Sequence, residues 1–147
     1  MTYNVLDVAR YIITYCNRNS RPISNLKLQK MLYYAWVDYF KETNIPLYME
    51  AICAWQFGPV VPEVYYEFCS FAGLPIEREY DVQLDVRDIP IINAILNRYI
   101  NASVSELVNR THEKNSPWYI TYRQGEGRRE PIPFPLIQEV EWRTHET

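Results

Sequence analysis

Apolar side chains recur every three or four residues along two stretches in the first third of the chain. Between residues 5 and 16 they form one stripe, which predicts an amphipathic helix capped by Asn4. Residues 26–40 follow Ser24, a second candidate cap, and are apolar nearly all round in their middle. A helix of that kind belongs at the centre of a fold. Its polar end, which we expect at the surface, carries Lys27, Gln29 and Lys30.

Residues 62–72 predict a third helix. Pro62 is suited to the first helical position, and Glu63 places an acidic group in the first turn. Gly73 and Pro75 end the helix. The predicted buried stripe consists of Val64, Tyr65, Phe68, Cys69 and Ala72.

The second half of the chain continues with helical patterns. A periodic segment after Asp88 predicts a helix up to residue 100, and Ser103 begins an S-x-x-E capping box for the next one. Ser116 and Pro117 predict a short helical turn that places Trp118 against the core. A last short helix is expected over residues 135–143.

Strand signals are few. Residues 47–57 mix β-branched and aromatic side chains, and residues 78–86 alternate weakly, so we expect these two segments to pair as a hairpin. Residues 123–131 form a polar, glycine-containing segment that predicts a flexible loop. The whole pattern predicts one compact, mainly α domain with a small β-hairpin, with a core over about residues 4–122.

Composition narrows the function classes. The chain has 147 residues and a net charge of −3, which argues against binding to nucleic acid as the main activity. The three cysteines, Cys16, Cys53 and Cys69, are far apart and predict buried free thiols in a reducing compartment. We see no signal peptide and no membrane span, and we expect a cytoplasmic protein.

Candidate chemistry is sparse. The two histidines, His112 and His145, lack nearby cysteine or histidine partners, so we predict no metal site and no cofactor. His145 is expected to be solvated. His112 follows a predicted helix, where the helix dipole favours a hydrogen-bonded structural histidine. No nucleophile motif accompanies it, and we predict no catalytic residue.

The stretch WQFGPVVPEVYY, residues 55–66, combines aromatic residues with a rigid backbone. Gly58 permits unusual backbone angles, and prolines at positions 59 and 62 fix φ at two points. One interpretation is a structural corner between a strand and a helix. The other is a stiff platform that presents Gln56, Glu63 and Tyr66 to a partner, because a rigid surface loses little entropy on binding. The two interpretations are compatible.

Three strings, LKLQKMLYYA, PLYMEAICAWQFGPVVPEVYYEF and THEKNSPW, together resemble the Panacea domain family of SocA-like, phage-associated (GepA-like) proteins. The resemblance spans about residues 8–118. Two departures stand out: Trp36 and Val37 replace a Gln-Gly-type pair, and Gln56 and Phe57 replace a basic residue followed by tyrosine or histidine. The positions that match the family motifs are Lys27, Leu28, Gln29, Lys30, Tyr33, Tyr34, Trp55, Gly58, Pro59, Val60, Pro62, Tyr65, His112, Pro117 and Trp118.

The resemblance implies a mainly helical antitoxin that neutralises a cognate toxin by direct contact. It also implies, for the SocA branch, an adaptor that delivers the toxin to a Clp-type protease. It supplies no catalytic residue. The side chains that we consider for partner binding are Lys27, Gln29, Lys30, Tyr33, Gln56, Glu63, Tyr66 and His112.

Two alternatives remain open at this point. An enzyme is conceivable if His112 meets Gln29, Lys30 or Glu63 in a pocket. A DNA-binding autoregulator is the other alternative, and the acidic net charge disfavours it.

Overall fold

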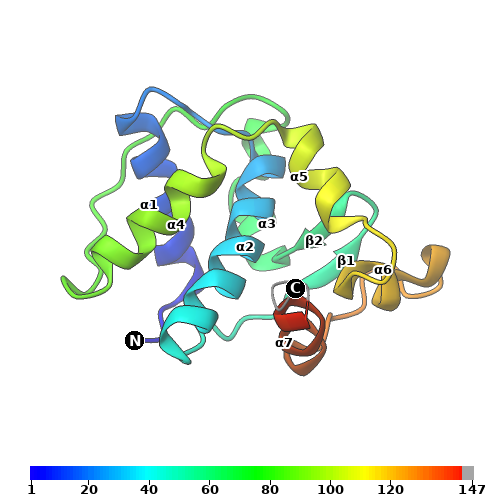
Figure 1. The fold of residues 1–147 in the computed structure, drawn as a ribbon. Helices are drawn as coiled ribbons and strands as arrows, with labels where there is room; N and C mark the ends of the chain where they lie inside the picture. The colour runs from blue at the N-terminus through cyan, green and yellow to red at the C-terminus, as the bar shows by residue number, and fades with distance from the viewer. Residues whose placement is uncertain (144–147) are drawn as a thin grey trace.

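The structure is a computed structural model that describes residues 1–143. The second helix lies at its centre. Helix α2 (Asn25–Thr43) is contacted by helices from both halves of the chain, and Figure 1 shows it running between α1 and α4 on one side and the hairpin on the other. Its large side chains, among them Trp36 and Tyr39, are almost completely buried. The prediction of a central helix is confirmed.

The described residues form seven α-helices and one two-stranded antiparallel hairpin, as expected for a compact, mainly α domain with a small β element. No helix in this part of the chain is long and apolar enough to cross a membrane. His145 lies outside the described residues. The other helices and strands are α1 (Val5–Arg18), β1 (Cys53–Trp55), β2 (Gly58–Val60), α3 (Pro62–Glu67), α4 (Ile89–Tyr99), α5 (Val104–Thr111), α6 (Pro117–Tyr122) and α7 (Phe134–Arg143).

Most helix starts follow the predicted caps. The side chains of Asn4, Ser24, Ser103 and Ser116 each accept a hydrogen bond from a backbone N–H in the first turn of the helix that follows. The indole of Trp118 is buried at the start of α6, as the sequence indicated.

The predicted hairpin partner was wrong. Strand β1 pairs with β2, the segment immediately after it, in the register Cys53 with Val60 and Trp55 with Gly58. Residues 78–86 form no strand. The weak alternation of that segment reflects side chains such as half-buried Val82 and buried Leu84, which pack on the core from an irregular backbone.

The segment expected to be a flexible loop is held against the other edge of β1. The amide of Ala54 donates to the carbonyl of Glu130 at 2.8 Å, and the amide of Ile132 donates to the carbonyl of Ile52 at 2.7 Å. Gly127 approaches α6 so closely that a Cβ there would lie 1.8 Å from the carbonyl oxygen of Thr121. Residues 127–132 are therefore part of the hairpin layer and not a detached loop.

Helix α3 is shorter than predicted. It ends at Glu67, and a 3₁₀ turn over Cys69–Phe71 follows. The change of direction leaves Cys69 and Ala72 exposed, so the predicted stripe holds only for Val64 and Phe68. The three thiols differ accordingly: Cys16 and Cys53 are buried as expected, whereas Cys69 is not.

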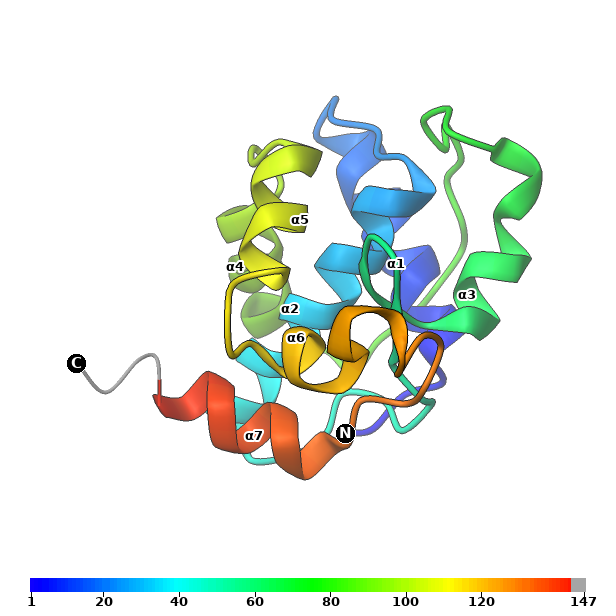
Figure 2. The ribbon, with the colours of Figure 1, turned by 90° about the vertical axis from the view of Figure 1, so that its right-hand side faces the viewer.

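Helices α5, α6 and α3 surround the hairpin layer, while α7 closes the molecule at the end of α2 (Figure 2). Trp36 stacks on Phe134 at a centroid distance of 4.8 Å, and Phe40 contacts Trp142 edge to face. These aromatic contacts attach α7 to the core.

Candidate functional site

Lys30 lies inside the protein and fixes the hairpin to α2. Its side chain is fully buried, and Nζ donates to the carbonyl of Pro59 at 2.8 Å. Gly58 makes this approach possible, because a Cβ at that position would lie 2.9 Å from Lys30 Cε and 2.8 Å from Thr111 Oγ1. Burial lowers the pKa of the Lys30 ammonium to about 7.

The neighbouring polar residues of α2 have similar roles. Gln29 accepts from the amide of Val61 at 2.9 Å and donates to Asn25 Oδ1 at 3.0 Å. Lys27 Nζ donates to the carbonyl of Ile100 at 2.6 Å, just beyond α4. Each head group satisfies a backbone group of another element: Lys30 in the middle of β2, Gln29 just before α3 and Lys27 just after α4.

The expectation that this end of α2 emerges at the surface was therefore wrong. The exposed fractions are 9% for Lys27, 1% for Gln29 and 0% for Lys30. Tyr33 is also buried, and its hydroxyl donates to Glu141 Oε1 on α7 at 2.7 Å. These four side chains offer a partner almost no surface in this structure. Their polarity is used internally, which a helical pattern alone does not reveal.

The late motif holds the hairpin from the opposite direction. Trp118 Nε1 donates to the carbonyl of Trp55 at 2.6 Å, and the Trp118 ring stacks on His112 at a centroid distance of 3.8 Å. We call Lys27, Gln29, Lys30 and Trp118 the polar brace, because all four connect distant elements through side-chain hydrogen bonds to the backbone.

His112 differs from the hydrogen-bonded group that we expected. Its Nε2 is buried and has no hydrogen-bond partner among residues 1–143. Burial, and to a smaller extent the charge of Lys30, lowers the pKa of the imidazole. These effects oppose and outweigh the stabilisation of a charged ring that the helix dipole was expected to supply.

The enzyme alternative required His112 to meet Gln29, Lys30 or Glu63 in a pocket. Lys30 and His112 are near enough to influence each other electrostatically, but Glu63 is exposed on α3. Of these four side chains, only Gln29 lines one of the two large surface hollows, and His112 does not join it there. Within residues 1–143, no three His, Cys, Asp or Glu side chains gather at one point as metal ligands would.

Exposed candidates gather around the hairpin. Gln56 and Phe57 form its tip, and Tyr66 projects from α3 with an exposed fraction of 56%, close to the 58% of Phe57. Glu63 is exposed in the first turn of α3. The structure thus displays Gln56, Glu63 and Tyr66 at the surface as the platform interpretation requires, while their role in binding stays a prediction.

A hollow of about 570 Å³ lies beside the hairpin tip. We call Tyr66 together with six residues of the lining the hairpin face. Trp55 contacts the rings of both Tyr65 and Tyr66, at centroid distances of 5.0 and 6.0 Å. These six lining residues are Trp55, Gln56, Phe57, Tyr65, Arg128 and Arg129.

Sequence reasoning missed the two arginines of this face. They lie in the segment expected to be a flexible loop, far from the WQFG residues in the chain. Arg129 nevertheless sits over the Trp55 ring, with Cζ 4.9 Å from its centroid. Only the pairing of residues 129–132 with β1 brings these residues together, and the sequence pattern gave no sign of that pairing.

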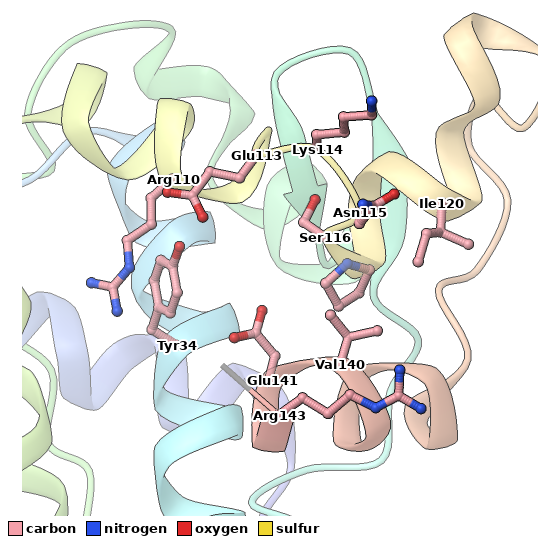
Figure 3. A pocket seen from close by; sticks show the side chains of 11 residues that line it. Tyr34, Arg110, Glu113, Lys114, Asn115, Ser116, Ile120, Val140, Glu141 and Arg143 are labelled. Carbon is pink, nitrogen blue, oxygen red and sulfur yellow. The ribbon is translucent and has the colours of Figure 1, made fainter. Parts of the chain in front are cut away.

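A second hollow, of about 640 Å³, separates the α5–α6 turn from α7 (Figure 3). Its lining mixes charges: Arg110, Lys114 and Arg143 lie among Glu113 and Glu141. In Figure 3 Glu141 projects from α7 toward Tyr34, and the Arg110 guanidinium lies 4.8 Å from the Tyr34 ring centroid. The two hollows share no lining residue.

Comparison with known protein families identifies the family of this chain. Residues 28–119 match the family described as antitoxin SocA-like, Panacea domain, and the chain belongs to this family. The matched residues include α2 from Leu28 onward and the hairpin.

Among curated proteins, the chain is similar to Antitoxin SocA of Caulobacter vibrioides (strain NA1000 / CB15N), with 34% identity over 110 residues. The match covers 66% of this chain and 58% of the relative, so the chain spans less than two thirds of that protein's length. No solved structure matches the chain.

Proposed function

We propose that this protein is a non-enzymatic antitoxin that neutralises a cognate toxin by direct contact through the hairpin face. Membership of the antitoxin SocA-like family supports the antitoxin role. The observation that carries the choice of surface is the exposure of Phe57 and Tyr66 beside an aromatic hollow. Large, partly buried aromatic side chains are the residues that most often dominate the energy of protein interfaces.

The brace supports this role mechanically. It fixes β2 and the start of α3 to α2 through the carbonyl of Pro59 and the amide of Val61, and it fixes β1 to α6 through the carbonyl of Trp55. A face that is already rigid loses little conformational entropy when a partner binds. The buried motif residues thus serve binding by positioning the exposed ones.

The proposal is tested by expressing the product of the adjacent gene with and without this protein. The expected result is growth arrest by the neighbour alone, rescue by the wild-type antitoxin, and co-purification of the two proteins. A neighbour that is harmless alone, or a rescue that occurs without binding, would contradict the proposal.

The surface is tested with the double variant Phe57→Ala/Tyr66→Ala. We expect it to weaken binding by about 2 kcal/mol or more, because truncation of aromatic hot spots has this effect. The matched control is Leu74→Ala/Val86→Ala, which removes two apolar side chains that are 69% and 80% exposed outside this face. Equal affinities for the two variants would locate the interface elsewhere.

A protease-adaptor version of this function requires a second contact surface. The hollow between the α5–α6 turn and α7 offers one that shares no lining residue with the hairpin hollow. This version predicts that the toxin has a short half-life only when both the antitoxin and a Clp-type protease are present. A toxin half-life independent of the protease leaves simple sequestration as the function.

A further inference from the structure

The hairpin hollow carries positive charge without any acidic group. Its lining contains Arg128 and Arg129 and neither aspartate nor glutamate, although the chain as a whole has 18 acidic and 15 basic residues. The hollow between the α5–α6 turn and α7, by contrast, is lined by both basic and acidic side chains. The local field at the hairpin therefore opposes the net charge of the molecule.

These two arginines also make no ion pair with a carboxylate among the described residues. Arg10, Arg18, Arg87, Arg98, Arg123 and Arg143 each make an ion pair with a carboxylate of this chain. Arg128 and Arg129 make none with any residue that the structure describes, and both side chains are exposed. A guanidinium without an internal partner is available for a carboxylate from another molecule.

The backbone holds Arg129 in place. Its amide donates to the carbonyl of Ala54 at 2.6 Å, and the close approach of Gly127 to α6 anchors the preceding turn. The guanidinium lies over the Trp55 ring, and in such stacking its N–H edges remain free to bind a carboxylate. The aromatic walls of the hollow, Phe57 and Tyr65, lie beside these charges.

We propose that the hairpin hollow recognises an acidic segment of the toxin, in which a carboxylate side chain lies next to an aromatic or aliphatic one. The carboxylate pairs with Arg128 and Arg129, and the apolar neighbour packs on Trp55 and Phe57. This inference rests on the proposed antitoxin function and specifies the chemistry of the toxin surface that the hollow accepts.

The first experiment measures the affinity of the neighbouring gene product for Arg128→Glu/Arg129→Glu by calorimetry. We expect a loss of at least about tenfold, because reversing charges in a complementary interface is strongly unfavourable. The loss should shrink between low and high salt as the charges are screened. Circular dichroism and thermal melting establish that each variant is folded.

The matched control is Arg21→Glu/Arg78→Glu, in which neither arginine has an ion pair with any described residue. It produces the same change in net charge at two exposed arginines that lie outside the hollow. We expect its affinity to stay within about twofold of wild type, because distant exposed charges are largely screened. An equal loss in both double variants would overturn the inference, since it would mean that net charge alone controls binding.

A second experiment locates the acidic segment. Peptides that tile the neighbouring gene product are tested for binding, and the expected peptides contain aspartate or glutamate next to an apolar residue. Replacing those acids with their amides should abolish binding to the wild-type protein. Binding peptides without acidic residues, or with unchanged affinity as amides, would overturn the inference.

The outcomes separate the two proposals. Wild-type binding that survives Arg128→Glu/Arg129→Glu overturns the acidic-segment inference and leaves the antitoxin function in place. The absence of any wild-type binding overturns the antitoxin proposal itself. Binding of single-stranded or duplex oligonucleotides that depends on these arginines, with no binding of the protein, would assign the charge to nucleic acid and overturn the inference.

Discussion

The polar brace and the hairpin face are built largely from the same short motifs but place their side chains in opposite environments. In the brace, Lys30 is completely buried and satisfies a backbone carbonyl. In the face, Phe57 is 58% exposed two residues before the proline to which Lys30 binds. Within one motif, therefore, some residues are buried and hold the surface in position, while others are exposed and form that surface.

Substitutions in the brace and in the face should have different effects on folding and binding. Changes in the brace should destabilise the fold and affect binding only through the loss of folded protein. Changes in the face should leave the fold intact and weaken binding directly.

Gly58→Ala should be the most damaging single change. The residue has a φ of +114°, and the added Cβ would collide with Thr111 Oγ1 and Lys30 Cε. Strain and overpacking together should cost about 4 kcal/mol of unfolding free energy. Urea unfolding followed by tryptophan fluorescence measures this cost. Gly73→Ala is the control, because a Cβ there meets no atom within 4 Å and the change should be nearly neutral.

The charge of Lys30 should make stability depend on pH. Burial holds the folded-state pKa near 7, below the value in the unfolded chain, so the unfolded state binds more protons between about pH 7 and 10. Stability should therefore rise with pH across this window. Relative to Lys30→Met, the wild type should gain at most about 4 kcal/mol, because the pKa is lowered by about three units and each unit corresponds to about 1.4 kcal/mol.

Urea unfolding of both proteins at several pH values measures this gain. Taking the difference between them cancels groups such as Cys16, whose thiol pKa burial raises to about 11. A constant difference between the two proteins would show that Lys30 titrates normally. That result would contradict its burial as a charged group.

His112 should contribute a smaller effect at lower pH. Its folded-state pKa is lowered, so the unfolded state takes up the proton first as pH falls through about 6.5, and stability decreases. His112→Phe keeps an aromatic ring against Trp118 and removes the titration. The stability of this variant should be flatter between pH 7 and 5, by less than about 1 kcal/mol because the ring is only partly buried. Steeper acid sensitivity in the variant would be inconsistent with this assignment.

The sequence predicted the helices well because their signals are local. Stripes of apolar residues and the caps at Ser103 and Ser116 depend only on neighbours within one or two turns. The hairpin pairing failed because it depends on a tight turn at Gln56 and Phe57, which the length of the apparent strand over residues 47–57 concealed.

The site was predicted only in part for a related reason. Gln56, Glu63 and Tyr66 are exposed as the platform interpretation required, whereas Lys27 and Lys30 are inside. Lysine is rarely buried, and its burial here depends on distant carbonyls at Ile100 and Pro59. The arginines of the face come from a segment whose position depends on pairing with β1.

Hydrogen–deuterium exchange of the antitoxin, with and without the neighbouring gene product, tests the separation of scaffold from surface most directly. We expect slower exchange of the backbone amides on binding at residues 55–57, 65–67 and 127–130, with no change in α1 or α4. Slower exchange confined to α1 and α4, with the hairpin face unaffected, would contradict it.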